Sequence, residues 1–442
     1  MSMELTKRLW EQPTDKGVLA YHIIQSFSPG EATPDQVHEI GCEFARRFLA
    51  DRFECTVSTH LDKGHLHNHI VVNSVSYADG KMFRNNFDTY YHGIRQVSDE
   101  LCRENRLSVI ETDGKGKSYD EWLSGQTGKP TIRGMVRKDV ELNGFYGAYW
   151  ACAGGSDCAV ITMIGDDPED RLARSAVKWL CGCGVNVLTM SPAKKDYGHH
   201  NYPLERVETA ISWLKANGNR KIGIAGASTT GTLALTAAAM FPDITLTIAM
   251  TPSDFVWQGF MQGKRDGCKE WPVEGESLFS YRGKLLPYMP FCYQHPDYWH
   301  CIAAESKRAG DMVNSRKLFD DSETAHPIEP EEYIPVENIR GKLLLIGAED
   351  DALWDTAKYI RRMEKRLAEK PHECEIETMV YAHGTHFVFP EGMLKIMLPV
   401  GAGLFVRLAF QAAKQFPEAC RQTRQDIDRR VSAAIHAWTS TE

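Results

Sequence analysis

Short apolar runs alternate with segments of helical spacing along most of the chain downstream of residue 157. Six apolar runs of strand length lie at 158–165, 185–192, 221–227, 244–252, 342–348 and 374–384. Four segments whose apolar residues recur at helical spacing lie at 169–180, 202–218, 229–241 and 356–370. Continuous apolar strands between amphipathic helices are typical of a parallel sheet that is covered on both faces. The sequence therefore predicts an α/β fold built on a parallel, doubly wound sheet.

Two regions depart from this alternation. The residues at roughly 253–340 are rich in Gly, Pro and aromatic side chains, and the stretch is long for a loop in a compact domain. We therefore expect an inserted lid there. Upstream, short predicted strands and helices without the regular alternation indicate a separate α+β segment. The sequence thus predicts a first segment at 1–123, a linker at 124–140 and the α/β domain at 141–442.

Composition and charge exclude several classes of protein. The 442 residues carry a formal net charge of −8, which gives no overall basic surface for nucleic acid. The 12 cysteines are scattered without paired Cys-x-x-Cys sets, which argues against a zinc ribbon and against a disulfide scaffold. The first 17 residues lack the apolar stretch of a secretory signal, and no later apolar stretch is long enough to cross a bilayer. We therefore expect a cytoplasmic protein with no membrane partner.

Ser228 lies at a predicted turn between a strand and a helix. In the surrounding sequence, KIGIAGASTTGTLAL, the strand ends one residue before the serine and the helix begins directly after it. A nucleophile elbow requires this context, with small residues such as Gly226 beside the serine. The helix N-terminus would offer the Thr229 N–H to a developing oxyanion. A second donor would come from the loop that contains Gly165 and Asp166.

Candidate partners for this serine follow two later predicted strands. Asp350 and Asp351 come directly after the fifth apolar run, and His386 comes after the last one. The order Ser, Asp, His is that of α/β-hydrolases, in which serine attacks a carbonyl, histidine transfers the proton and the acid orients the imidazole. A Gly-x-x-Asp spacing selects Asp350 as the acid, whereas the spacing to the following tryptophan selects Asp351, so both stay open. His383 is a weaker alternative as the base.

Four stretches in this region have a family resemblance: GIAGASTTGTLAL, YRGKLLPYMPF, GAEDDALW and YAHGTHFVFPE. Through them the chain from about 145 to 438 resembles the α/β-hydrolase domain of the acyl-CoA thioesterase and bile-acid-CoA:amino-acid N-acyltransferase family. The resemblance implies an ester or thioester substrate, with acyl-CoA among the candidates, and a covalent acyl-enzyme. Members that transfer acyl groups to amino acids carry a cysteine nucleophile, so Ser228 implies hydrolysis. Thr230 stands where the family has glycine two residues after the nucleophile.

A histidine cluster lies in the first segment, in the stretch HLDKGHLHNHIVVN at 60–73. His65, His67 and His69 alternate along a predicted strand, so their side chains share one face. His60 lies just upstream and completes the set from a preceding strand or turn. Imidazoles gathered in this way suit a divalent cation. The four histidines are therefore candidate metal ligands.

The same segment has a second resemblance, in AYHIIQSFSPGEATPDQVHEIG, THLDKGHLHNHIVVNSV and YYHGIRQVSDELCRENRLSVIE. Over residues 17 to about 123 the chain resembles a plasmid-mobilisation relaxase of the MobA/VirD2 kind. In such enzymes the histidines hold a cation that polarises the scissile phosphate of DNA, and a tyrosine near the N-terminus attacks it. Residues 1–16 contain no tyrosine, and residues 1–134 hold 16 Lys and Arg against 19 Asp and Glu. We therefore expect a truncated, incomplete relaxase-like segment, with DNA as a weaker candidate partner.

The sequence as a whole favours a serine α/β-hydrolase that acts on a small-molecule acyl ester or thioester through a Ser-His-Asp triad. This chemistry requires no cofactor, and a divalent metal at the histidine cluster is the cofactor that the sequence suggests for the first segment. The alternatives are a metal-dependent DNA relaxase and a DNA-binding remnant fused to a hydrolase.

Overall fold

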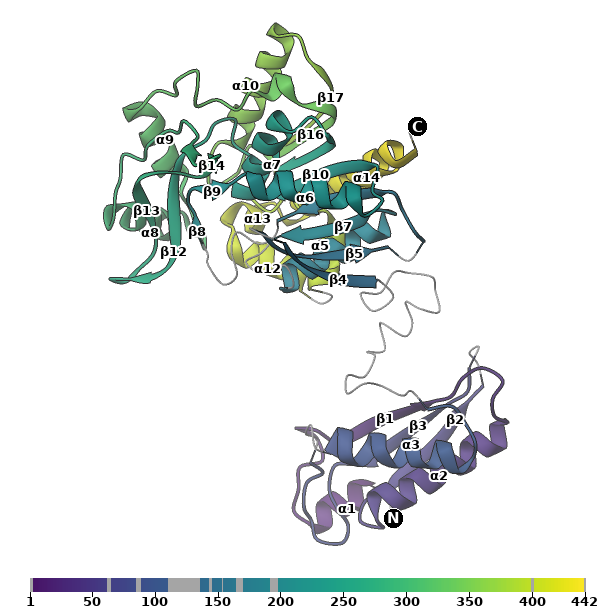
Figure 1. The fold of residues 1–442 in the computed structure, drawn as a ribbon. Helices are drawn as coiled ribbons and strands as arrows, with labels where there is room; N and C mark the ends of the chain where they lie inside the picture. The colour runs from purple at the N-terminus through teal and green to yellow at the C-terminus, as the bar shows by residue number, and fades with distance from the viewer. Residues whose placement is uncertain are drawn as a thin grey trace. The chain divides into compact units, whose positions relative to one another are not determined.

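The computed structural model in Figure 1 describes residues 3–61, 65–84, 89–109, 136–142, 145–152, 154–163, 170–190, 198–398 and 401–440. The chain divides into two compact units, Met1–Ser118 and Tyr119–Glu442. The N-terminal unit has one hydrophobic core, and the C-terminal unit has two. No helix in the described ranges is both long enough and apolar enough to span a membrane.

The C-terminal unit is built on an eight-stranded sheet in the order β17-β16-β11-β10-β6-β7-β5-β4. The six strands from β17 to β7 run parallel, whereas β5 pairs antiparallel with both β7 and β4. The strands are β4 (Val136–Leu142), β5 (Phe145–Ala151), β6 (Cys158–Thr162), β7 (Asn186–Met190), β10 (Lys221–Ala227), β11 (Ile244–Met250), β16 (Arg340–Ala348) and β17 (Glu373–Tyr381). The predicted doubly wound α/β sheet is therefore confirmed. Strand β4 begins inside the range expected as a linker, 124–140, so that range overlaps the sheet.

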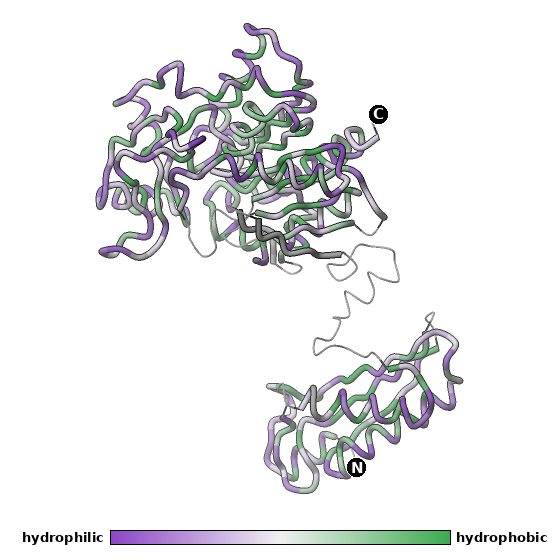
Figure 2. Tube along the Cα trace, in the orientation of Figure 1, coloured by the Kyte–Doolittle hydropathy of each residue, from purple (hydrophilic) through white to green (hydrophobic). Residues whose placement is uncertain are grey.

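Helices cover both faces of this sheet because its strands are apolar on both sides. In β6, Ile161 belongs to one core and Val160 to the other, as the two-residue period of a strand requires. The first core takes in α6 (Glu205–Ala216), α7 (Thr229–Met240) and α10 (Thr356–Glu369). The second takes in α5 (Arg171–Gly182), α11 (Glu391–Met397), α12 (Ala402–Ala409), α13 (Gln411–Gln415) and α14 (Pro417–Ser440). Figure 2 shows hydrophobic colouring through the strands and hydrophilic colouring along the outer loops.

Side chains at the helix starts explain several of these boundaries. Asp170 and Asp355 accept hydrogen bonds from main-chain N–H groups in the first turns of α5 and α10, at 2.8 Å and 3.0 Å. The sequence predicted a helix from residue 202, but α6 begins at Glu205. Tyr202 and its neighbour instead form the short strand β9 (Tyr202–Pro203), because the Tyr202 N–H donates to Leu278 O at 2.9 Å.

An inserted segment separates β11 from β16 and has its own small sheets and helices. β12 pairs with both β13 and β8 (Gly198–His199), and β14 pairs with both β15 and β9. Its elements are β12 (Gln258–Arg265), β13 (Cys268–Ser277), β14 (Phe279–Tyr281), β15 (Lys284–Leu285), α8 (Asp297–Ala309), α9 (Arg316–Ala325) and the 3-10 helix η3 (Val336–Asn338). Arg362 on α10 donates to both carboxylate oxygens of Asp254, at 2.8 Å and 2.6 Å, and to Glu323 of α9 at 2.9 Å. These ion pairs attach the inserted segment to the main sheet.

The N-terminal unit is a three-stranded antiparallel sheet with helices packed on one face. Its strands lie in the order β1-β3-β2, and α2 and α3 cover one side (Figure 1). Ile70 and Val72 of β3 pack against Phe44 of α2 and Leu101 of α3. The elements are α1 (Met3–Leu9), β1 (Ala20–Ser26), α2 (Pro34–Leu49), β2 (Cys55–His60), β3 (His67–Asn73), the π-helix η1 (Thr89–Arg95) and α3 (Gln96–Glu104). Helix α1 is not among the helices that the sequence predicts.

A buried ion pair between α11 and α14 generates a stability prediction. Arg424 is 3% exposed and donates to Glu391 at 2.8 Å, whereas Arg421 forms an exposed pair with Glu418. Arg424→Met removes the buried partner of the Glu391 carboxylate and leaves only a longer contact of 3.7 Å to the exposed Lys395, so urea denaturation should show the C-terminal unit destabilised by about 3 kcal/mol. Arg421→Met is the matched control and should cost less than about 1 kcal/mol. Equal effects of the two substitutions would contradict the prediction.

Candidate functional site

Ser228 occupies the turn between β10 and α7 in an unusual backbone conformation. Its φ is 59° and its ψ is −131°, a region that residues with a side chain rarely adopt. Its N–H donates to Met250 O at 2.9 Å, and its carbonyl accepts from Gly231 N at 2.9 Å and Thr232 N at 3.1 Å. The serine is therefore held between the end of β11 and the first turn of α7. This is the geometry that exposes a nucleophile above a parallel sheet.

Small residues around Ser228 make this turn possible. A Cβ atom on Gly226 would collide with the main chain of Thr230, and one on Gly231 would lie 2.7 Å from Met250 O. Thr230 closes the turn itself. Its hydroxyl donates to Ala227 O at 2.8 Å and accepts from Ala227 N at 3.0 Å. A hydroxyl thus stabilises the turn at the position where the resembled family has glycine.

His386 and Asp351 form a buried pair at the same edge of the sheet. His386 follows β17 and Asp351 follows β16, and the imidazole Nδ1 lies 2.9 Å from each carboxylate oxygen. The exposed fractions are 8% for His386 and 2% for Asp351. The Leu353 N–H and the Thr356 hydroxyl also donate to Asp351. A carboxylate on Nδ1 keeps the proton there and directs the Nε2 lone pair away from the pair.

The Nε2 atom of His386 is buried, and no group in the described part of the chain hydrogen-bonds it. The ring of Trp354 packs edge-on against the imidazole, with 4.9 Å between the ring centroids. The imidazole is therefore fixed on one side by a carboxylate and on another by an aromatic ring. Its remaining nitrogen is available for proton transfer.

Asp350 has different contacts from its neighbour. Its Oδ1 atom accepts from Gly384 N at 2.9 Å and from Thr385 N at 2.7 Å, and its Oδ2 atom lies 3.2 Å from His383 Nδ1. The His383 ring stacks on Phe416 at 3.9 Å. Asp350 therefore fixes the turn that precedes His386 and contacts the ring of His383.

The expected oxyanion donors are only partly described. Thr229 is the first residue of α7, so its N–H is one of the first-turn donors that have no acceptor within the helix. The residue is 8% exposed. Gly165 and Asp166 lie outside the described residues. The sequence missed Thr251, which follows β11 with a φ of 44° and whose carbonyl accepts from Trp354 Nε1 at 3.1 Å. Its backbone conformation gives no signal in the sequence.

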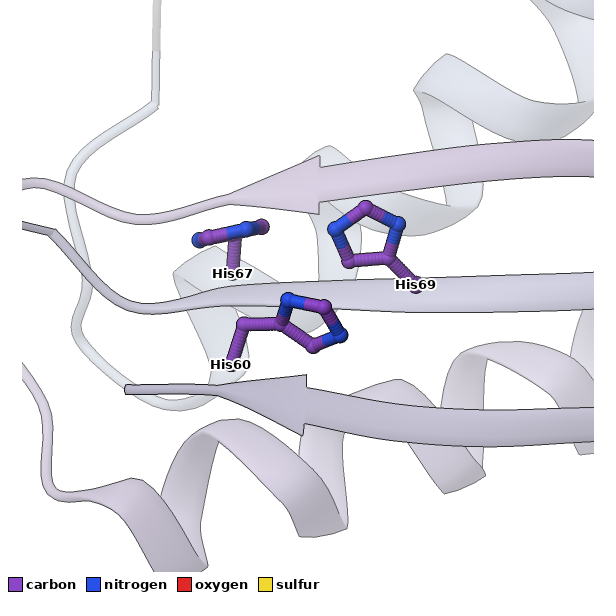
Figure 3. Close-up of side chains that lie close together, drawn as sticks. All are labelled: His60, His67 and His69. Carbon is purple, nitrogen blue, oxygen red and sulfur yellow. The ribbon is translucent and has the colours of Figure 1, made fainter. Parts of the chain in front are cut away.

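The histidine cluster lies on the face of the N-terminal sheet opposite the core that α2 and α3 form with Ile70 and Val72, and His67 in it is buried. One ring nitrogen from each of His60, His67 and His69 lies within 4.8 Å of the others, and Figure 3 shows the three rings grouped across β2 and β3. His60 and His67 are paired directly across the two strands. Metal–nitrogen bonds of about 2.0–2.1 Å bring ligand nitrogens to within about 4.2 Å of one another, so small ring rotations suffice. Three imidazoles in this arrangement fit a divalent cation.

Two further histidines border this cluster. His65, which the sequence proposed as a ligand, is not in the group of three, although its ring lies 5.2 Å from that of His67. His22 was not predicted and stands on β1, with Nε2 2.6 Å from His69 Nδ1. The sequence gives no direct signal for it, because only the pairing of β1 with β3 brings His22 beside His69.

Two families match separate parts of the chain. Residues 1–107 match the relaxase family described as MobA/VirD2-like, nuclease domain, and residues 202–391 match BAAT / acyl-CoA thioester hydrolase C terminal. The first range contains the histidine cluster, and the second contains Ser228, both aspartates and His386. Both resemblances that the sequence predicts are therefore confirmed. The strand order and the second match make the C-terminal unit an α/β-hydrolase domain by fold.

Curated relatives match part of the chain. Protein rlx of Staphylococcus aureus is 44% identical over 120 residues, which cover 27% of this chain and 36% of that protein. The group II intron-interrupted relaxase LtrB of Lactococcus lactis subsp. cremoris is 32% identical over 126 residues, which cover 26% of this chain and 22% of that protein. The chain thus spans roughly a third or less of the length of these relatives.

Solved esterase structures overlap the chain at low scores. The esterase Pf2001 of Pyrococcus furiosus is 16% identical with a TM-score of 0.38, and the match covers 75% of this chain and 100% of that one. Est1E from Butyrivibrio proteoclasticus is 14% identical with a TM-score of 0.30, over 64% and 98% of the two chains. At these scores the fold assignment rests on the strand order and the family match.

The strained serine generates a prediction about stability. Ser228→Gly should relieve a backbone strain of about 1–3 kcal/mol, less the 0.5–1 kcal/mol or so that glycine costs through its freedom in the unfolded chain. Ser228→Ala removes the same hydroxyl but keeps the strain, so it is the matched control. Denaturant unfolding should therefore find the glycine variant more stable than the alanine variant by about 1 kcal/mol. A glycine variant that is less stable than the alanine variant would show that the turn is unstrained.

Proposed function

We propose that the C-terminal unit is a serine hydrolase that cleaves an ester or thioester through an acyl-enzyme on Ser228. One observation supports this most directly. A serine in a strained strand-to-helix turn follows β10, and a buried His386–Asp351 pair, whose Nε2 has no partner among the described residues, follows β17 and β16 of the same parallel sheet. The carboxyl ends of such strands meet at one edge, where α/β enzymes bind their substrates.

The reaction divides into two steps in this proposal. In the first, Ser228 Oγ attacks the substrate carbonyl and its proton passes to His386 Nε2. The oxyanion faces the free N–H groups at the start of α7, and the leaving alcohol or thiol departs with the proton from His386. In the second, His386 takes a proton from water, the hydroxide attacks the acyl-enzyme, and the proton returns to Ser228 as the acid is released.

The choice of acid follows from the contacts of the two aspartates. Asp351 accepts from His386 Nδ1 and is therefore assigned the role of orienting the base. Asp350 is assigned a positioning role, because it accepts from two main-chain N–H groups of the turn before His386. Acyl-CoA is the thioester that the family match suggests, and a simple carboxylic ester is the alternative substrate.

The nucleophile can be identified by covalent labelling. A fluorophosphonate probe should label the full-length protein, and peptide mapping should find the label on Ser228. Ser228→Ala should abolish both labelling and hydrolysis of p-nitrophenyl esters and acyl-CoA, while circular dichroism stays unchanged. Comparison of the two substrates identifies the preferred leaving group. Full activity of the alanine variant would refute the proposal.

Substitution of the two aspartates should lower kcat to different extents. Asp351→Asn leaves the imidazole in the wrong tautomer, so kcat should fall by roughly 10⁴-fold. Asp350→Asn loosens only the turn that carries the base, so a smaller loss of at most about 100-fold is expected. The isosteric change is the same in both variants, so each is the control for the other. A larger loss of kcat in Asp350→Asn than in Asp351→Asn would show that Asp350, and not Asp351, orients the base.

A second proposal concerns the N-terminal unit, which we infer binds a divalent cation through His60, His67 and His69. The nitrogens of these side chains lie within 4.8 Å of one another, and the relaxase match covers all three. When bound, such a cation supplies Lewis-acid polarisation of a phosphate oxygen. DNA is the substrate of that alternative activity, although the near balance of acidic and basic residues in this unit gives weak attraction to phosphate.

Cation binding can be measured on the full chain by titration with Co²⁺ or Mn²⁺. His67→Ala should weaken the affinity at least tenfold, because it removes one of three ligands. His436→Ala, at an exposed position on α14, should leave the affinity unchanged. If the protein cleaves a labelled DNA single strand only with the cation, and His67→Ala loses this cleavage, the N-terminal unit would also have relaxase activity. Equal affinities for the two variants would place the cation elsewhere.

A further inference from the structure

Backbone strain gathers at one edge of the large sheet. In the described residues, Ser228, Thr251 and Thr385 have positive φ values of 59°, 44° and 59°. They follow β10, β11 and β17, whose carboxyl ends meet at this edge. Strain of this kind persists at sites where function maintains it. Ser228 has a role as the proposed nucleophile, and Thr385 precedes the proposed base, which leaves Thr251 without an assigned role.

Thr251 combines this strain with a buried hydroxyl that has no protein partner. The residue is 1% exposed, and no group in the described part of the chain hydrogen-bonds Oγ1. The hydroxyls beside it are satisfied: Ser253 donates to Phe255 O, and Thr385 accepts from Phe387 N at 3.1 Å. A buried hydroxyl without a partner is destabilising, and each such group calls for an explanation. β-Branched side chains also fit poorly at positive φ, so threonine here gives the fold no advantage.

The neighbours of Thr251 place it between the proposed nucleophile and the proposed base. The preceding carbonyl, Met250 O, accepts from Ser228 N at 2.9 Å. Thr251 O accepts from the indole N–H of Trp354, whose ring packs against His386. Thr251 Oγ1 and His386 Nε2 are therefore both buried without partners among the described residues, as is Thr162 Oγ1 at the end of β6, on the far side of β10.

The order of strands decides which part of the reaction Thr251 can contact. Strand β6 lies on one side of β10, whereas β11, β16 and β17 lie on the other. Thr251 follows β11, so it is on the side of His386. That side holds the group that exchanges a proton with the base, which is the leaving atom in acylation and water in deacylation.

We propose that the Thr251 hydroxyl hydrogen-bonds the leaving-group atom and then the hydrolytic water beside His386. This inference rests on the proposed hydrolase function. The hydroxyl accepts a hydrogen bond from water while His386 removes the other proton, and water then attacks the acyl carbon. Thr251 is unchanged at the end of the cycle.

Valine replaces the hydroxyl of Thr251 with a methyl group of the same shape and keeps the strain. In Thr251→Val, release of p-nitrophenol in the first turnover should stay fast, because nitrophenolate departs without a proton. Steady-state turnover should fall by about 10- to 100-fold, so a burst of one equivalent precedes it and acyl-enzyme accumulates. Mass spectrometry of the quenched protein should find the acyl group on Ser228. Thr251→Ser keeps a hydroxyl and should retain turnover within a few fold.

Fluorophosphonate labelling provides the internal control, since fluoride also departs without a proton. Thr251→Val should label at the wild-type rate and unfold at a temperature no lower than wild type, because it removes an unpaired buried hydroxyl. Thr251→Gly also lacks the hydroxyl and suits positive φ, so it should reproduce the slow deacylation if the valine variant folds poorly. Wild-type turnover in both hydroxyl-free variants would overturn this inference alone. Absence of label on Ser228 in the wild-type protein would instead overturn the hydrolase proposal.

Discussion

The hydrogen bond from Ser228 N to Met250 O continues the parallel pairing of β10 with the last residue of β11 beyond the end of β10. It forces the chain to turn sharply at the serine, since α7 begins at the next residue. The turn then requires Gly226 and Gly231, where any side chain would collide with main-chain atoms. The position of the proposed nucleophile therefore follows from the pairing of two strands, and its surroundings follow from the resulting lack of space.

The same sheet edge holds two aspartates that are adjacent in sequence and have different contacts. Successive residues after a strand point in different directions, so Asp351 contacts His386 and Asp350 contacts the turn before it. One carboxylate contacts the His386 imidazole directly, and the other hydrogen-bonds the backbone that precedes it. Strain at Ser228, Thr251 and Thr385 surrounds this pair, which is the distribution expected where function opposes stability.

The N-terminal unit is built on a separate, antiparallel sheet that carries the histidine cluster. Helices cover one face of its three antiparallel strands, and the opposite face presents His60, His67 and His69. Asn68 points to the covered side, where its side-chain NH₂ donates to Val37 O at 2.7 Å. The alternation of a strand thus places the buried amide on one face of the sheet and the clustered imidazoles on the other. Each unit has its own core, and the matched families are unrelated in chemistry.

The sequence alone determined the parallel sheet, the order Ser-Asp-His and the shared face of alternate histidines, because these follow from apolar periodicity and spacing along the chain. It could not choose between Asp350 and Asp351, since that choice depends on side-chain direction after β16. It could not show that His60, His67 and His69 group most closely, or find His22, because cross-strand pairing decides which histidines meet. Nor could it find the strain at Thr251, which arises where β11 meets the serine turn and the Trp354 side chain. Local patterns fix the elements, whereas contacts between residues distant in sequence decide the site.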